Sequence, residues 1–121
     1  MTAALIYHLC RRSEWEAAQA LGRYPGSSQD VADGFIHFST AAQLVESARK
    51  HRAGQEELVV LEVDAAALGT ALNWETSRRG QIFPHLYGLL PLAAVRRVVD
   101  LKLGADGQHV FPQHLVDNLS G

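Results

Sequence analysis

The sequence predicts an α+β fold in which a small mixed, split β-sheet packs with two main helices. Short apolar runs rich in strand-forming residues recur along the chain, and two other segments carry apolar residues at helical spacing behind capping-box signals. Strands and helices alternate only in the first half of the chain, and strands dominate the second half. This order favours α+β over a strictly alternating parallel sheet.

Length and composition predict a single domain over residues 1–121, with residues 104–121 as a C-terminal tail. The chain is 47% hydrophobic and 20% charged, and this balance excludes a disordered segment and a coiled coil. A chain of this length buries enough surface to fold without disulfides or metal.

The first predicted elements are a strand over residues 4–9 and a helix of about two to three turns. Ser13 and Glu16 have the spacing of a capping box at the start of this helix, and Gly22 ends it. Residues 24–28 contain proline, glycine and serine and are expected to form a loop.

A second strand and helix follow. Residues 34–39, opened by a glycine, form the predicted strand, and Thr40 with Gln43 repeats the capping-box spacing. The helix ends in the basic segment 49–52, which suits the negative end of the helix dipole.

Strands dominate from residue 58 onward. Residues 58–63 form an apolar strand, Asp64 caps a short helical turn over residues 65–68, and residues 72–75 form a short strand. A polar loop follows over residues 76–81.

A proline interrupts the next strand-like segment, residues 82–88. Because proline lacks an amide hydrogen, Pro84 confines this segment to an edge, a strand start or a bulge. Residues 95–103 form the last strong strand, and the tail contains turn residues with a short closing helix near Leu115.

Charge and cysteine content argue against several classes of function. The net charge of −2 and pI near 6.3 make nucleic acid an unexpected partner, and most basic residues occur in scattered pairs typical of solvated surface. Arg78–Arg79 is the pair that lies near other candidate polar residues. Cys10 is the only cysteine, which fits a reducing compartment, and no apolar run is long enough to span a bilayer. A cytoplasmic location is therefore expected.

Six histidines are a mild excess for 121 residues. Three of them, in helix-end and tail segments, are interpreted as solvated surface: His51, His109 and His114. The other three lie in or beside apolar strands and are flanked by aromatic residues: His8, His37 and His85. Each alone is typical of a hydrogen-bonded core histidine, but together they predict a shared polar pocket with aromatic walls.

Two alternatives for this pocket are weaker. Three histidines could ligate zinc with one open position, but no His-x-His or His-Glu-x-x-His pair occurs, and we predict no metal. Cys10 lies two residues from His8 and on a strand would share its face, but nothing else marks its thiol as activated. A core cysteine is the preferred interpretation.

The segment from Trp74 to Gly80 is the other candidate. Glu75 at a strand end could act as a general base or bind a ribose hydroxyl, and Arg78 and Arg79 could hold a phosphate. An ordinary polar loop with a surface ion pair explains the segment equally well. Ser39 and Thr40 could offer backbone amides to an anion at a helix start, although capping alone accounts for them.

These residues together resemble the bacterial domain-of-unknown-function family 952. The resemblance rests on segments spread over about residues 4–100: Tyr7-His8, Trp15, Gly34-Phe35-Ile36-His37-Phe38-Ser39, Gln43, Trp74-Glu75 and Phe83-Pro84-His85-Leu86-Tyr87-Gly88. At fold level that family is similar to the ADP-ribosyltransferases, which hold NAD in the cleft of a split, mixed sheet. The resemblance therefore implies an ADP-ribosyltransferase-like fold and NAD or a related nucleotide as the candidate ligand.

The resemblance to the transferases also implies roles for individual residues. Tyr7-His8 looks like their aromatic-histidine pair, whose imidazole holds a ribose hydroxyl, and residues 34–39 look like the strand under the nicotinamide pocket. This chain departs from the pattern at two positions. Leu9 stands where those enzymes carry glycine, and His85 stands where they place a catalytic glutamate.

The leading hypothesis is a cleft that binds a nucleotide or NAD-like small molecule, with transferase or hydrolase activity on it. The expected ligand-binding residues are Tyr7, His8, His37, Ser39, Trp74, Arg78, Arg79 and Tyr87. His8 is expected to orient the ligand, either Glu75 or His85 to supply acid–base chemistry, and Arg78 or Arg79 to meet phosphate. One alternative is a non-enzymatic ligand-sensing or protein-interaction module, and a second is a metal-dependent hydrolase.

Overall fold

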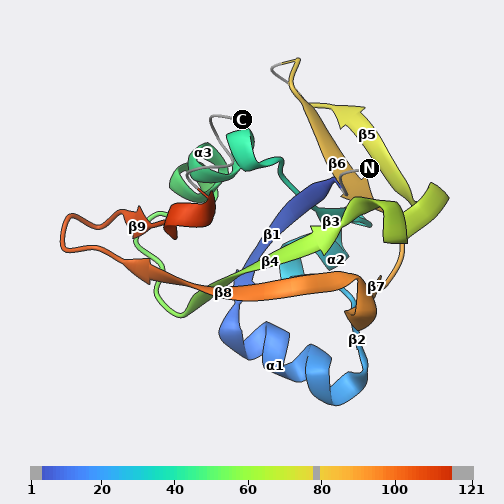
Figure 1. Ribbon diagram of the computed structural model, residues 1–121, viewed down its shortest axis with the longest axis horizontal. Coiled ribbons are helices and arrows are strands. Elements are labelled where there is room, and N and C mark those ends of the chain that lie inside the picture. The colour runs from blue at the N-terminus through green and yellow to red at the C-terminus, as the bar shows by residue number, and fades with distance from the viewer. Residues whose placement is uncertain (1–3, 78–79, 116–121) are drawn as a thin grey trace.

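The computed structural model describes residues 4–77 and 80–115 of the chain. Its largest sheet has the strand order β1-β4-β8-β9, formed by β1 (Leu5–Arg11), β4 (Leu58–Asp64), β8 (Val95–Leu103) and β9 (His109–Val110). β1 pairs with β4 in a register that runs from Leu5 opposite Asp64 to Arg11 opposite Leu58. Figure 1 shows β1, β4 and β8 crossing the middle of the molecule, with β9 at the left.

Two smaller sheets complete the β structure. One has the order β3-β6-β5, from β3 (Ile36–His37), β6 (Ile82–Leu86) and β5 (Leu72–Thr76), and the other pairs β2 (Arg23–Tyr24) with β7 (Leu90–Pro91). The sheets curl into a half-barrel. Every strand pairing within the described residues is antiparallel, so the predicted mixed sheet is wrong. The β5–β6 pair, for example, is a hairpin, whereas parallel pairing needs a long crossover.

A backbone bridge joins the two larger sheets. Tyr7 of β1 and Ser39 exchange both backbone hydrogen bonds, each with an N···O distance of 2.8 Å. This isolated bridge lies two residues beyond the end of β3. Through this bridge the backbone of β1 is hydrogen-bonded to the segment that follows β3.

Three helices lie around the sheets: α1 (Arg12–Leu21), α2 (Ser28–Asp33) and α3 (Ala41–His51). Two 3₁₀ segments, η1 (Ala65–Ala71) and η2 (Leu92–Ala94), precede β5 and β8. The prediction of two main helices missed α2, which begins in the segment expected to be a loop. Ser27 and Asp30 form a reciprocal cap at its start, because each backbone amide donates to the other side chain, at 2.8 and 3.3 Å.

The helix starts were predicted unequally well. The capping box of Thr40 and Gln43 is confirmed at the start of α3, with distances of 3.3 and 3.0 Å. The cap predicted from Ser13 and Glu16 is wrong, because α1 begins at Arg12 and the carboxylate of Glu14 accepts from the Arg11 amide at 2.9 Å. Gly22 ends α1 as predicted, with a φ of 91° in the left-handed region.

Pro84 lies in the central strand of its sheet rather than in the expected edge strand, strand start or bulge. Its carbonyl accepts a hydrogen bond from the Phe38 amide at 3.0 Å, on the side of β3. The proline nitrogen, which has no hydrogen to donate, faces the same side. β3 ends at His37, and the ladder on that side therefore needs no hydrogen from Pro84.

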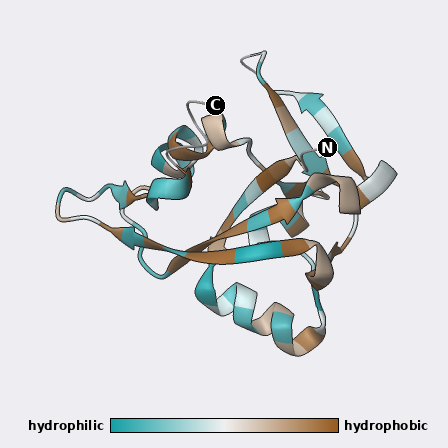
Figure 2. Cartoon of the chain, viewed as in Figure 1, coloured by the Kyte–Doolittle hydropathy of each residue, from teal (hydrophilic) through white to brown (hydrophobic). Residues whose placement is uncertain are grey.

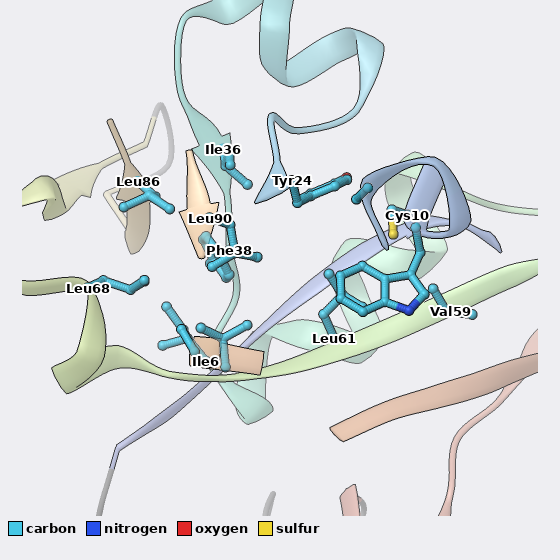
Figure 3. Close-up of a cluster of buried hydrophobic side chains, with 14 residues drawn as sticks. Ile6, Cys10, Tyr24, Ile36, Phe38, Val59, Leu61, Leu68, Leu86 and Leu90 are labelled. Atoms are coloured by element: carbon cyan, nitrogen blue, oxygen red, sulfur yellow. The ribbon is translucent and has the colours of Figure 1, made fainter. Parts of the chain in front are cut away.

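The apolar core lies on both sides of β4, whose seven residues are all buried. One cluster lies against α1 and the smaller sheets, and Figure 3 shows many of its members, among them Ile6, Tyr24, Phe38, Leu61 and Leu90. The second cluster lies against α3 and the end of the described chain and contains Tyr7, Leu44, Leu58, Val60, Leu101 and Leu115. In Figure 2 hydrophobic colour runs along the central strands, while much of α1 and α3 is hydrophilic.

The C-terminal segment contains more structure than a plain tail. β9 pairs with β8, and residues 113–115 are helical, as expected for a closing helix near Leu115. Within the described ranges, no helix is both long and apolar enough to cross a membrane.

Candidate functional site

A large cleft, with a volume of about 1250 Å³, lies between β1, α2, α3 and the β5–β6 hairpin. Its wall includes all three of the strand histidines, His8, His37 and His85. It also includes the aromatic rings of Phe35 and Phe83 and several neutral polar side chains, among them Ser27, Ser39, Gln43, Thr76 and Gln81.

His85 forms a hydrogen-bonded pair with Glu75. Its Nδ1 atom lies 2.7 Å from the Oε1 atom of Glu75, and the Tyr87 hydroxyl donates to the same oxygen at 2.7 Å. Strand pairing explains the contact, because Glu75 and Asn73 alternate along one face of β5 and Asn73 is opposite His85. The hydrogen bonds from Tyr87 and then His85 hold the pKa of Glu75 below its usual value.

His37 lies between two carboxylates on α2. Its Nδ1 atom is 2.6 Å from Asp30 Oδ1, and its Nε2 atom is 3.2 Å from Asp33 Oδ2. Asp30 is buried and also accepts hydrogen bonds from the backbone amides of Ser27 and His37. Burial acts to raise the pKa of Asp30, but the hydrogen bond from the His37 ring, the charge interaction with His8 and the two backbone amides outweigh it and lower the pKa to about 2.

His8 has protein partners at both ring nitrogens. Nδ1 lies 2.6 Å from the His37 carbonyl oxygen, which can only accept, so Nδ1 carries the hydrogen. The Tyr24 hydroxyl lies 2.7 Å from Nε2 and donates to it. Burial lowers the pKa of His8, and a neutral imidazole satisfies both contacts.

Phe35 joins the histidines into an aromatic cluster. Its ring centroid is 4.2 Å from that of His85, 4.5 Å from that of His37 and 5.3 Å from that of Tyr87. The centroids of His37 and His85 are 5.5 Å apart. The His37 side chain is 40% exposed and that of His85 14%, so solvent reaches both from the cleft.

Residues 9–98 match the model of a family described as protein of unknown function (DUF952). The match covers well over half of the sequence. The chain belongs to the DUF952 family.

Solved relatives of this DUF952 chain come from Caulobacter crescentus. The crystal structure of its protein CC0527 has 50% sequence identity and a TM-score of 0.88, covering 93% of this chain and 98% of that one. The solution NMR structure of the same protein has 50% identity and a TM-score of 0.81, covering 91% of this chain and 95% of that one. No curated protein matches the chain.

The cleft of this DUF952 chain brings together five of the residues singled out from the sequence: Tyr7, His8, His37, Ser39 and His85. Glu75 and Tyr87 are joined to this group through the hydrogen bonds around His85. Trp74 is not, because it alternates with Glu75 on β5, pairs with Pro84 and is half exposed on the other face. Arg78 and Arg79 lie outside the described residues.

Sequence reasoning missed three residues of the site. Asp30 was overlooked although Ser27 and Asp30 have the spacing of a capping box, which also predicts α2. Phe35 was noticed only as a neighbour of His37. Tyr24 was assigned to a loop, and no local pattern marks its hydroxyl as the partner of His8.

Two observations concern the metal and thiol alternatives. In residues 4–77 and 80–115, no group of three or more histidine, cysteine or acidic side chains is arranged to hold a metal ion. Cys10 is buried, and burial raises the pKa of its thiol to about 12. A thiol in that state is a poor nucleophile near neutral pH.

Proposed function

We propose that this DUF952 chain binds a nucleotide or NAD-like small molecule in the cleft and acts on it as a transferase or hydrolase. The observation that carries the proposal is the pair of His85 and Glu75, whose contact of 2.7 Å lies beside a solvent-accessible cleft. A histidine oriented by a carboxylate is a recurrent arrangement for general acid–base catalysis.

The lining of the cleft supports this class of ligand. The Phe35 and Phe83 rings offer apolar faces on which a nucleobase can stack. Serine, threonine and glutamine side chains around them can hydrogen-bond ribose hydroxyls. A split sheet around a cleft is also the arrangement in which the ADP-ribosyltransferases, which the family resembles, hold NAD.

In the proposed mechanism His85 is the general base. Its Nδ1–H donates to Glu75, which fixes the tautomer and leaves the Nε2 lone pair to accept a proton from water or an acceptor hydroxyl. Tyr87 holds the Glu75 carboxylate in place through its hydroxyl. Among the described residues Nε2 of His85 has no hydrogen-bond partner, so it is available to a ligand.

His8 takes a different role from the one expected. Both of its ring nitrogens are occupied by protein partners, and its side chain is only 3% exposed. We therefore assign it to positioning: it holds the backbone of β3 against β1, and so places His37 in the cleft.

Calorimetric titration with NAD, ADP-ribose and ADP tests binding, and product analysis of the same mixtures tests turnover. Glu75→Gln should retain binding and lower turnover by roughly 10²-fold or more, because the amide cannot orient and stabilise the His85 imidazolium. Glu56→Gln, an exposed position outside the cleft, is the matched control and should behave as wild type. Absence of any heat change with wild-type protein at millimolar ligand would overturn the nucleotide proposal.

A ligand-sensing or protein-interaction module is the second candidate. The observation that favours it is the fully bonded, buried His8, which is typical of a structural histidine. It predicts that His8→Ala and His85→Ala lower the thermal unfolding midpoint while no turnover of any of the three nucleotides is detected in wild type.

A further inference from the structure

We infer that the end of the cleft beside the C-terminus of α3 is an anion-binding subsite built from Arg11, Lys50 and Arg52. It would take the phosphate groups of the ligand. The assignment to a nucleotide rests on the proposed function, whereas the affinity for phosphate stands on the cationic groups themselves.

Arg52 is the fixed member of the subsite. Its side chain is half-buried and donates to the Leu9 carbonyl at 3.2 Å and to the Gln55 side-chain oxygen at 3.3 Å. Both partners are neutral, so the charge of the guanidinium is not compensated by them. Its remaining N–H groups can bind an oxyanion in the fork geometry that guanidinium offers.

Arg11 and Lys50 bring two further cations to the same end of the cleft. Arg11 alternates with Leu9 and Tyr7 on the face of β1 that lies against α3, and Lys50 is in the last turn of α3. Within the described part of the chain neither side chain forms an ion pair, nor does Arg52.

Two acidic side chains also line this part of the cleft. Three cations against two carboxylates leave its net charge positive. Glu14 is engaged by the Arg11 amide at 2.9 Å, and Glu46 lies one helical turn before Lys50. Complementing the helix dipole accounts for basic residues in the last turn of α3. It does not account for Arg11, which belongs to β1.

Lys50 and Arg52 lie at the end of α3 opposite its contact with the β5–β6 hairpin. Gln43, in the first turn of α3, donates to the Ile82 carbonyl of β6 at 2.8 Å, which places the start of α3 at the hairpin that carries His85. Arg52, at the other end of α3, donates to Leu9 of β1. Arg52 follows Gln43 by nine positions, which corresponds to roughly 14 Å along a helix axis at 1.5 Å per residue. A ligand that spans the cleft would therefore have an aromatic end and an anionic end.

Calorimetry with inorganic pyrophosphate, ADP and adenosine tests the subsite. In the double variant Arg11→Gln/Lys50→Gln, the affinity for pyrophosphate and ADP should fall by about tenfold or more, while adenosine affinity stays unchanged. The matched control is Arg49→Gln/Lys102→Gln, which removes the same charge from α3 and β8 outside the cleft lining and should change neither affinity. Circular dichroism verifies that each variant is folded.

The outcomes separate this inference from the proposed function. Pyrophosphate binding that the double variant loses supports the subsite whether or not adenosine binds. If ADP binds wild type no more tightly than adenosine, and pyrophosphate does not bind, the subsite is overturned while nucleoside binding is left standing. An equal loss in the control variant would also overturn it, because the effect would then come from net charge alone.

Discussion

His8 is a buried imidazole whose two nitrogens join three elements. It lies on β1, accepts from Tyr24 of β2 and donates to the carbonyl of His37 on β3. Its ring also packs against Phe38, with centroids 5.5 Å apart. Because the polar partners are buried with it, removing the ring leaves a cavity and two groups without a hydrogen bond.

We expect His8→Ala to lower the free energy of unfolding by about 2–4 kcal/mol, measured by urea denaturation at pH 7.5. His51→Ala is the matched control, because that side chain is exposed at the end of α3, and its effect should stay within about 0.5 kcal/mol. Equal stability of the two variants would contradict the structural role of His8.

The stability contributed by His8 depends on pH in a defined direction. Burial lowers its pKa in the folded protein below the ordinary 6.5, so the unfolded chain binds a proton more readily than the folded one. The contribution is fully present above pH 6.5 and falls as the pH drops below it. The difference in unfolding free energy between wild type and His8→Ala should therefore shrink between pH 7.5 and pH 5.5.

The candidate site could be predicted from the sequence only in part, for reasons visible at single residues. His37 and His85 stood out because a histidine in an apolar strand needs a partner. Glu75, the partner of His85, lies on the neighbouring strand of the same hairpin, so local strand pairing was enough to suggest the contact. Tyr24 reaches His8 through chain folding over 16 residues, and no local pattern marks that contact. Asp30 was missed although it lies seven residues from His37 and has the capping-box spacing to Ser27.

At the scale of elements, α2 and β3 form a unit held by Asp30. This one carboxylate caps the helix through the Ser27 amide and binds both the backbone amide and the ring of His37. Gly26 allows the close approach, since a Cβ atom added there would lie 2.6 Å from Asp30 Cβ, and its φ is 103°. A side chain at residue 26 would therefore displace the carboxylate.

We expect Gly26→Ala to lower the free energy of unfolding by about 2–5 kcal/mol and to shift the His37 ring resonances in NMR spectra. Gly34→Ala is the matched control: its φ of 88° is also left-handed, but no atom lies within 4 Å of the added Cβ. Backbone strain alone should cost about 1–2 kcal/mol there. If the two variants are equally stable, Asp30 is not held by close packing at Gly26.

Helices and strands were predicted correctly where a local sequence rule determines them. The predicted strand over residues 95–103 coincides with β8, and the Thr40 cap starts α3 as expected. The position of Pro84 was mispredicted because the length of its neighbour β3, two residues, is set by the tertiary fold. Strand direction was mispredicted for the same reason, since pairing partners lie far apart in the chain.

At the scale of the whole molecule, the end of the described chain closes over the central sheet. His114 Nε2 lies 2.5 Å from Oε2 of Glu62, whose side chain on β4 is only 5% exposed, and Leu115 packs into the second apolar cluster. His114 was expected to be solvated surface, and this contact contradicts that expectation. The C-terminal segment thereby contacts the strand that lies between both halves of the core.

We expect His114→Ala to lower the free energy of unfolding by about 1–3 kcal/mol, because it leaves the buried Glu62 carboxylate unpaired. Glu62→Gln in the same background should recover part of the loss, since a neutral amide costs less to bury. A double-mutant cycle measured by urea denaturation checks the coupling, and additive effects would contradict it.

The complete burial of β4 has a consequence for how the chain avoids mispairing during folding. In most strands a slip by one residue exposes the apolar face, and water opposes it. Both faces of β4 are buried, so a slip by one residue would not expose an apolar face to water. A slip would instead move the Glu62 carboxylate into the other apolar cluster, away from His114. Glu62 thus fixes the register of a strand whose other side chains would fit several registers.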